Sequence, residues 1–281
     1  MTERVVDYYD EFDEWSRLET PSGRLEYERT LSYVSARLPP SSDVLDIGGG
    51  PGRYAIALAQ AGHRVSLVDP SNVQIAAARS RAADSGVLDR LSVIATGDIR
   101  DLTRFKSRSF DAVVALGPFY HLIEAAARLA AAQELFRVLR TAGQAFVAFI
   151  PRLSGLAGLI QRGANDPEQV TPEVLSRVAR SGLFINSTDR GFQDGYYPNI
   201  PDIERLFTDV GFAQEDLFSI RGLAFGYESD LQTIGESSPD SARAIERLLE
   251  AHCREPSVIA HGGHALLYLR KSTTVNGRTQ R

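Results

Sequence analysis

Four glycines within five residues, Gly48-Gly49-Gly50-Pro51-Gly52, directly follow a short apolar run at residues 44–47. A plain turn from a strand into a helix needs one glycine, or occasionally two. Four glycines let the backbone approach a ligand closely, and a helix that begins at Arg53 would add free N–H groups and a partial positive charge. The stretch therefore predicts a ligand-binding turn at the carboxyl end of a buried strand.

Short apolar runs alternate with helical patterns between residues 41 and 150. The expected strands are 43–47, 65–68, 91–95, 110–115 and 144–150, and the expected helices are 53–61, 73–83 and 123–139. Strands that alternate with helices form βαβ units, and their parallel sheet is covered by helices on both faces. This pattern predicts an α/β protein.

The remaining segments are less regular. Residues 1–40 have helical spacing that ends at Pro39-Pro40, and we expect them to form an N-terminal helical lid. One sheet domain is expected over residues 41–270, with further strands at 216–220 and 264–270 and substrate-side insertions at about 151–200 and 222–262. The polar tail, 271–281, is expected to be flexible.

Composition narrows the classes of function. The 31 basic and 36 acidic side chains give a net charge of −5 without a basic run, which disfavours nucleic acid as a partner. A single cysteine, Cys253, excludes an intramolecular disulfide framework and a cysteine-rich zinc site, and no metal is expected. No apolar stretch reaches 18 residues, and the N-terminus lacks the basic and then apolar pattern of a signal peptide. We expect a soluble cytoplasmic protein with no membrane partner.

Acidic residues mark the ends of the second and third expected strands. Asp69, followed by Pro70, is placed to accept hydrogen bonds from both hydroxyls of a ribose. Asp98 could accept from the exocyclic amine of an adenine while Ile99 packs on the ring. Each acid could instead cap a helix or a turn, but beside the glycine turn the pair predicts a nucleoside-containing ligand.

The glycine turn leaves two ligand classes open. Residues 50–55 also satisfy the G-x-G-x-x-A pattern of dinucleotide sites, so a nicotinamide-dependent oxidoreductase is one alternative. The carboxylate of Asp46 would repel a pyrophosphate, however, and Pro51 removes an N–H from the cradle that a pyrophosphate would use. A carboxylate at that position suits a ligand that carries an ammonium or sulfonium group.

Together these residues resemble the class I S-adenosylmethionine-dependent methyltransferases of the small-molecule type. The matching segments are 46–52, 97–98 and 110–117 together with Asp69, and the resemblance covers about residues 41–150, with a looser match from 216 to 270. Thr141-Ala142-Gly143 stands where the family usually has Pro-Gly-Gly. The family implies a Rossmann-like seven-stranded sheet in the order 3-2-1-4-5-7-6, with an antiparallel seventh strand and helices on both faces.

The resemblance implies S-adenosylmethionine as the cofactor and S-adenosylhomocysteine as its product. The glycines would hold the methionine part, with Asp46 near its amino group, and the other acids would bind the ribose and the adenine. Residues after the fourth strand would lie beside the sulfur, an N-terminal aromatic, Tyr8 or Tyr9, would close over the cofactor, and Arg17 or Arg24 could bind its carboxylate. The implied cofactor-binding residues are Tyr9, Arg24, Asp46, Gly48, Gly49, Gly50, Gly52, Asp69, Pro70, Asp98, Ile99, Leu116 and Gly117.

The implied reaction is methyl transfer to an oxygen, nitrogen or carboxylate of a small molecule or short peptide, mainly by proximity and in-line orientation. A base is needed only where the acceptor still holds its proton. Tyr120 and His121, just after the fourth strand, are the candidate catalytic residues, because histidine titrates near neutrality. His121 could instead be a structural imidazole that is bonded to a nearby carbonyl.

Aromatic residues in the two insertions are the candidates for the acceptor pocket. Tyr196, Tyr197, Phe225 and Tyr227 would form its apolar walls, or alternatively the core of a lid. A protein that binds the cofactor without catalysis, as a scaffold, is the alternative from outside the enzymes. The oligomeric state is not predicted.

Overall fold

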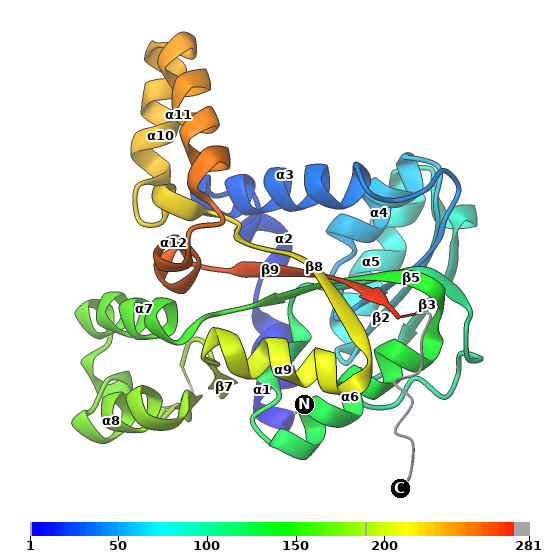
Figure 1. Ribbon diagram of the computed structural model, residues 1–281, viewed down its shortest axis with the longest axis horizontal. Coiled ribbons are helices and arrows are strands. Elements are labelled where there is room, and N and C mark those ends of the chain that lie inside the picture. The colour runs from blue at the N-terminus through cyan, green and yellow to red at the C-terminus, as the bar shows by residue number, and fades with distance from the viewer. Residues whose placement is uncertain (1, 189, 273–281) are drawn as a thin grey trace, which may run out of the picture.

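A computed structural model describes residues 2–188 and 190–272. Its centre is a seven-stranded sheet in the order β3-β2-β1-β4-β5-β9-β8 (Figure 1). The strands are β1 (Asp43–Ile47), β2 (Arg64–Asp69), β3 (Leu91–Thr96), β4 (Phe110–Ala115), β5 (Leu139–Phe149), β8 (Phe212–Ser219) and β9 (Ala265–Lys271). Strands β1 to β5 pair in parallel, and β9 runs antiparallel to both β5 and β8. The predicted order 3-2-1-4-5-7-6 is confirmed, since β8 is its sixth strand in the chain and β9 is its antiparallel seventh, which lies between β5 and β8.

Helices cover both faces of this sheet. Those packed against it are α3 (Pro21–Ser35), α4 (Arg53–Gln60), α5 (Asn72–Asp84), α6 (Ala125–Val138) and α9 (Ile200–Val210). Alternate residues of β1 point to opposite faces, so Val44 packs with α3, α4 and α5, whereas Leu45 and Ile47 pack with α6 and α9. The strands are apolar on both faces because each face is buried.

The start of β5 differs from the prediction. The sequence pattern predicts a helix that continues to Leu139 and a strand that begins at 144, but α6 ends at Val138 and β5 begins at the next residue. The expected turn at 141–143 lies inside the strand, where Ala142 has φ +60° and the register with β4 shifts between Phe110 and Ala112. The chain therefore enters the sheet through an irregular strand rather than through a loop.

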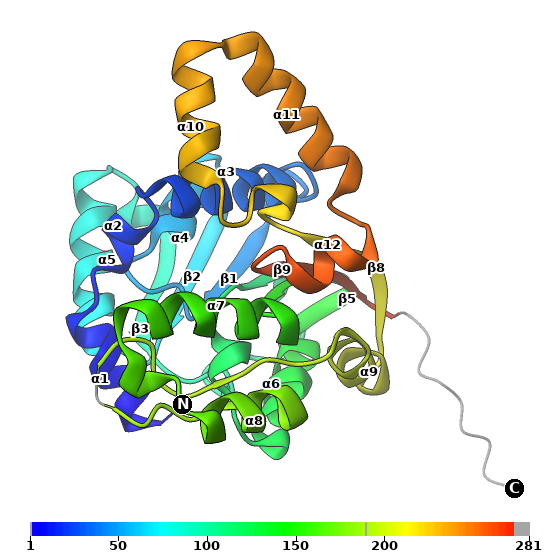
Figure 2. The same cartoon turned by 90° about the vertical axis from the view of Figure 1, so that its left-hand side faces the viewer.

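The remaining elements lie outside the central layers. They are α1 (Glu3–Glu11), α2 (Glu14–Arg17), α7 (Arg152–Asn165), α8 (Pro172–Ser181), α10 (Glu228–Ser237), α11 (Pro239–His252), α12 (Pro256–His261), the short strand pair β6 (Leu183–Phe184) and β7 (Gly195–Tyr196), and the 3-10 turns η1 (Leu88–Arg90), η2 (Pro118–His121), η3 (Pro167–Gln169) and η4 (Gly222–Ala224). Helices α10 and α11 project away from the sheet as a hairpin (Figure 2). Over residues 2–188 and 190–272, no helix has the length and apolar character needed to cross a membrane.

Candidate active site

The glycine turn joins β1 to α4. Gly48, Gly50 and Gly52 have φ angles of +70°, +53° and +87°, in the left-handed region that other residues rarely adopt. A Cβ at Gly49 would lie 2.5 Å from Oδ2 of Asp46, so a side chain would not fit there. A Cβ at Gly50 would instead meet a single side-chain atom within 4 Å, and it would project into open space. The turn needs glycine both for its conformation and to keep a cradle open.

Asp69 fixes this turn to the end of β2. Its carboxylate accepts hydrogen bonds from the backbone N–H of Gly50 and of Ser71, both at 2.9 Å, and the residue is 7% exposed. Burial raises the pKa of Asp69 to about 6, because the two backbone donors offset the loss of hydration only in part. Each carboxylate oxygen retains a lone pair for a further donor.

Asp46 is the least satisfied group of the site. It is 2% exposed, and its Oδ2 is buried without a hydrogen-bond partner within the described part of the chain. Burial and the nearby charge of Asp69 raise the pKa of Asp46 to about 7. Buried polar atoms are normally paired, so this oxygen fits a site that a donor or cation on a ligand completes.

These groups line a pocket that opens onto about 770 Å³ of space beyond the ends of β1, β2 and β4. The predicted residues that line it are Tyr9, Asp46, Gly48, Gly49, Gly50, Asp69, Pro70, Leu116, Gly117, Tyr120 and His121. Residues that the sequence did not single out also line it: Glu14, Leu18, Glu26, Arg53, Tyr54 and Gln74. We call this the glycine-turn pocket.

Four predicted residues are not brought into this lining. Arg24 is exposed on α3, where its guanidinium lies 3.5 Å from the Glu19 carbonyl, and Arg17 lines the pocket instead. Asp98 accepts hydrogen bonds from the Arg100 guanidinium at 2.6 and 2.8 Å. Two others have packing roles: Ile99 is buried in the core, and Gly52 forms the cap of α4.

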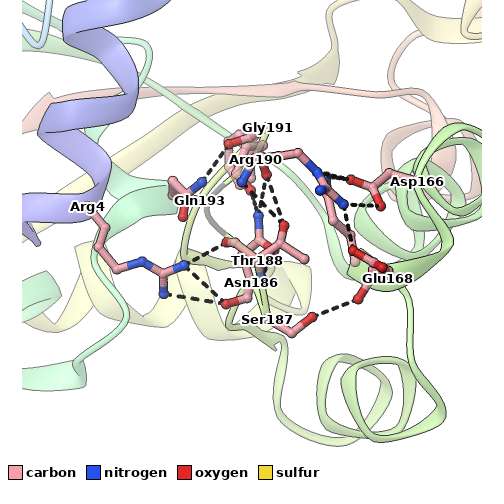
Figure 3. Close-up of polar contacts among 11 residues, drawn as sticks. Arg4, Asp166, Glu168, Asn186, Ser187, Thr188, Arg190, Gly191 and Gln193 are labelled. Atoms are coloured by element: carbon pink, nitrogen blue, oxygen red, sulfur yellow. Dashed lines mark hydrogen bonds and ion pairs between the residues drawn. The ribbon is translucent and has the colours of Figure 1, made fainter.

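The N-terminal helix α1 covers the pocket and is fixed on two sides. On one side, Gln74 of α5 donates to the backbone carbonyls of Tyr9 and Phe12. On the other side, Arg4 donates to the carbonyls of Asn186 and Thr188, at 3.3 and 2.8 Å (Figure 3). Since these anchors come from both halves of the chain, α1 bridges the sheet domain and the segment between α8 and α9.

His121 lies in η2 beneath this helix and is 2% exposed. Its Nδ1 is 3.0 Å from the carbonyl oxygen of Asp194, which can only accept, so Nδ1 carries the proton. Burial lowers the pKa of His121 to about 4, so the ring is neutral at pH 7 and Nε2 has a free lone pair. Nε2 therefore accepts from the hydroxyl of Tyr9, at 2.9 Å.

A partly buried network of ion pairs also lines the glycine-turn pocket. The Arg17 guanidinium binds Glu14 at 2.7 Å and Glu26 at 3.1 Å, and Nδ1 of His264 lies 2.9 Å from the other oxygen of Glu26. Burial alone would raise the pKa of Glu26, but His264 and Arg17 hold it well below its usual range. His264 is more than 200 residues from the other members of this network, and no local motif could have grouped it with them.

A second pocket adjoins the first, opens onto about 1140 Å³ of space, and shares Tyr9, Glu14, Arg17 and Tyr120 with it. Its walls are largely aromatic: Tyr8, Phe12, Phe192, Tyr197 and Phe225. We call this the aromatic pocket.

Two of the four predicted acceptor-pocket residues, Tyr197 and Phe225, line the aromatic pocket. Tyr196 does not, because consecutive residues of an extended segment point to opposite sides, and its ring lies 3.6 Å from the Arg128 guanidinium. Tyr227 is 66% exposed at the start of α10.

A sheet of this order, with an antiparallel strand beside β5, is the fold of a class I S-adenosylmethionine-dependent methyltransferase domain. Residues 44–143 match the family described as "Methyltransferase domain". The match covers the part of the chain where the sequence resembles the class I methyltransferases.

Curated relatives and solved structures agree with this assignment. The ubiquinone biosynthesis O-methyltransferase of Xanthomonas axonopodis pv. citri (strain 306) is 30% identical over 144 residues, which are 51% of this chain and 58% of that protein. Bovine mitochondrial ubiquinone biosynthesis O-methyltransferase is 27% identical over 51% of this chain and 42% of its own length. The matches thus span about half of the length of these relatives.

One solved structure with the same fold is magnesium protoporphyrin IX methyltransferase from Synechocystis PCC 6803 with bound SAH. It has a TM-score of 0.59 and 19% identity, over 95% of this chain and 98% of that one. The fold thus extends over nearly the whole chain, well beyond the family match.

The residues of the glycine-turn pocket fit the family's cofactor. The unpaired Oδ2 of Asp46 suits an ammonium group, Asp69 has lone pairs for hydroxyl donors, and the glycines leave space that a Cβ would fill. Over residues 2–188 and 190–272, no three His, Cys, Asp or Glu side chains are grouped so that they could hold a metal ion.

Proposed function

We propose that this protein transfers a methyl group from S-adenosylmethionine to an oxygen atom of a small molecule. The observation that carries the proposal is the pair of adjoining pockets, one at the glycine turn and one with aromatic walls, which share Tyr9 and Tyr120. Two substrates that react directly need two sites that meet at one point. The curated relatives are named as O-methyltransferases, which supports oxygen as the acceptor atom.

S-adenosylmethionine supplies an activated methyl group on a positively charged sulfur. In our proposal Asp46 receives the ammonium of its methionine part, and Asp69 accepts from its ribose hydroxyls. Leu116 and Gly117, at the end of β4, line the pocket near its junction with η2 and would lie beside the sulfur. Most of the rate enhancement would come from orientation, which can supply roughly 7–11 kcal/mol of a barrier.

The N-terminal helices would act as a lid in this scheme. The main-chain anchors of α1 hold Tyr9 over the junction of the two pockets. A closed lid excludes water, which strengthens the electrostatic interactions inside. Helices α7 and α12 would complete the acceptor side, since Ser154 and Gly263 line the aromatic pocket and are joined by a hydrogen bond.

Proton removal is needed for a hydroxyl acceptor and not for a carboxylate. The neutral Nε2 of His121 is the candidate proton acceptor, and it would act through the hydroxyl of Tyr9, which donates to it and also lines the aromatic pocket. Tyr120 would form the wall between the two substrates, since its ring contacts those of His121 and Phe192.

The proposal is tested by incubating the protein with methyl-labelled S-adenosylmethionine and a panel of small phenols, amines and carboxylic acids. Labelled oxygen methyl ethers or esters are expected, and transfer confined to amines would refute the choice of oxygen. Binding of S-adenosylhomocysteine without turnover of any acceptor would favour a scaffold. Binding of NADH in its place would favour an oxidoreductase.

A further inference from the structure

Among the described residues that line the aromatic pocket, Arg162, near the end of α7, is the arginine without a carboxylate partner. Its Nη2 donates to the hydroxyl of Tyr197 at 3.2 Å, and its guanidinium lies 5.1 and 4.8 Å from the ring centroids of Phe184 and Phe192. Its Nη1 is buried and has no hydrogen-bond partner, and no carboxylate pairs with Arg162, among the residues that the structure describes.

The other charged groups of this pocket are already neutralised. Arg17 binds Glu14, the one carboxylate among the described residues that line the pocket, and it also binds Glu26. Arg221 pairs with Glu228 at 2.9 Å. His264, the remaining group, lies against Glu26 as described above. Of the arginines that the structure describes in this lining, Arg162 is therefore the one whose charge is not balanced by a carboxylate.

The walls near Arg162 are flat and aromatic. On the lid, Tyr8 and Phe12 stack with ring centroids 5.0 Å apart, and on the other side Phe192 and Tyr197 stack at 6.5 Å. Burial and Glu14 raise the pKa of Tyr8 to about 12 against an opposing effect of Arg162, so the guanidinium acts across the pocket on the lid. Stacked rings of this kind favour a planar apolar guest.

We propose that the acceptor substrate is an aromatic acid, whose ring lies between these aromatic walls and whose anionic group pairs with Arg162. A guanidinium binds a carboxylate through two parallel N–H bonds, and Nη1 of Arg162 is a donor that still needs an acceptor. A guanidinium that lies over aromatic rings contacts them with its flat face, so the N–H groups along its edge can still donate to an anion. The inference rests on the proposed function, because it identifies the acceptor for that reaction.

The test is calorimetric binding to the protein saturated with S-adenosylhomocysteine. The probes are benzoate, naphthalene-2-carboxylate and anthracene-2-carboxylate, each compared with its neutral carboxamide. We expect at least one carboxylate to bind about tenfold or more tightly than its amide, which corresponds to about 1.4 kcal/mol. Equal affinities within every pair, tighter binding of the amides, or no binding of any carboxylate would overturn the inference.

Variants assign the preference to one side chain. Arg162→Met keeps the apolar stem and should abolish the carboxylate preference, whereas Arg162→Lys keeps the charge and should retain part of it. Arg180→Met, which removes a charge from the exposed end of α8, is the matched control and should behave as the unmodified protein. A preference that survives Arg162→Met would overturn the inference. Affinity for S-adenosylhomocysteine, measured first, separates this failure from failure of the proposed function.

Discussion

Replacing Asp46 by asparagine should make the ligand-free protein more stable and its cofactor binding weaker. In the unfolded chain this carboxyl ionises near its ordinary pKa of 3.8, whereas burial and Asp69 raise the folded value to about 7. A raised folded pKa favours the protonated form in the folded state, so the free energy of unfolding falls as pH rises from about 4 to about 7. At 1.36 kcal/mol per pH unit, the ionised group costs about 4 kcal/mol above pH 7.

The asparagine removes this charge and keeps an acceptor for the Ala55 N–H, which bonds to Asp46. Urea unfolding of the unmodified protein and of Asp46→Asn should be measured at pH 5 and pH 8. The free energy of unfolding should be higher for Asp46→Asn, and the difference should be larger at pH 8. Asp43→Asn, on the same strand, is the control. It should lower the free energy of unfolding at pH 8, because Asp43 pairs with Arg64 and Arg140 at 2.6 and 2.8 Å. A loss of stability at pH 8 in Asp46→Asn would refute the reasoning.

Three further variants test the site. Asp69→Ala should weaken S-adenosylhomocysteine binding by about 1–3 kcal/mol in calorimetry, as loss of charge-assisted hydrogen bonds does, and unchanged affinity would exclude its ribose role. Gly50→Val should abolish that binding while the circular dichroism spectrum stays native. Gly62→Val is the matched control and should bind normally, because Gly62 also has a left-handed backbone but has open space around it. His121→Asn should slow transfer to hydroxyl acceptors by about 10²-fold or more without affecting carboxylate acceptors, and an equal loss with both would mean a structural role. Because the pKa of His121 is about 4, the unmodified enzyme's rate should show no inflection from this group near pH 6.5.

The sequence predicted the sheet and one wall of the site well, because both depend on local patterns. Alternating strands and helices identify a parallel sheet, and the carboxyl ends of its strands must lie at one edge. Gly48, Asp46 and Asp69 could therefore be grouped from their positions in the sequence. Even the order of the last two strands followed from the family resemblance.

The lid and the acceptor pocket could not be predicted in the same way. Their residues meet only through the packing of separate elements. Arg17 of α2 lines the pocket and binds Glu26 of α3, whereas Arg24 does not reach the pocket. No sequence pattern pointed to Arg162, because a single arginine near the end of a helix is common. Tyr196 and Tyr197 are neighbours with opposite orientations, which composition alone cannot distinguish.

The most direct test of the central claim is calorimetric titration of the protein with S-adenosylhomocysteine and, separately, with NADH. Within the described part of the chain, Oδ2 of Asp46 lacks a hydrogen-bond partner and Asp69 is held by two N–H groups, so the glycine turn predicts tight binding of S-adenosylhomocysteine and none of NADH. Binding of NADH alone would mean that the turn holds a pyrophosphate, and it would contradict the methyltransferase account.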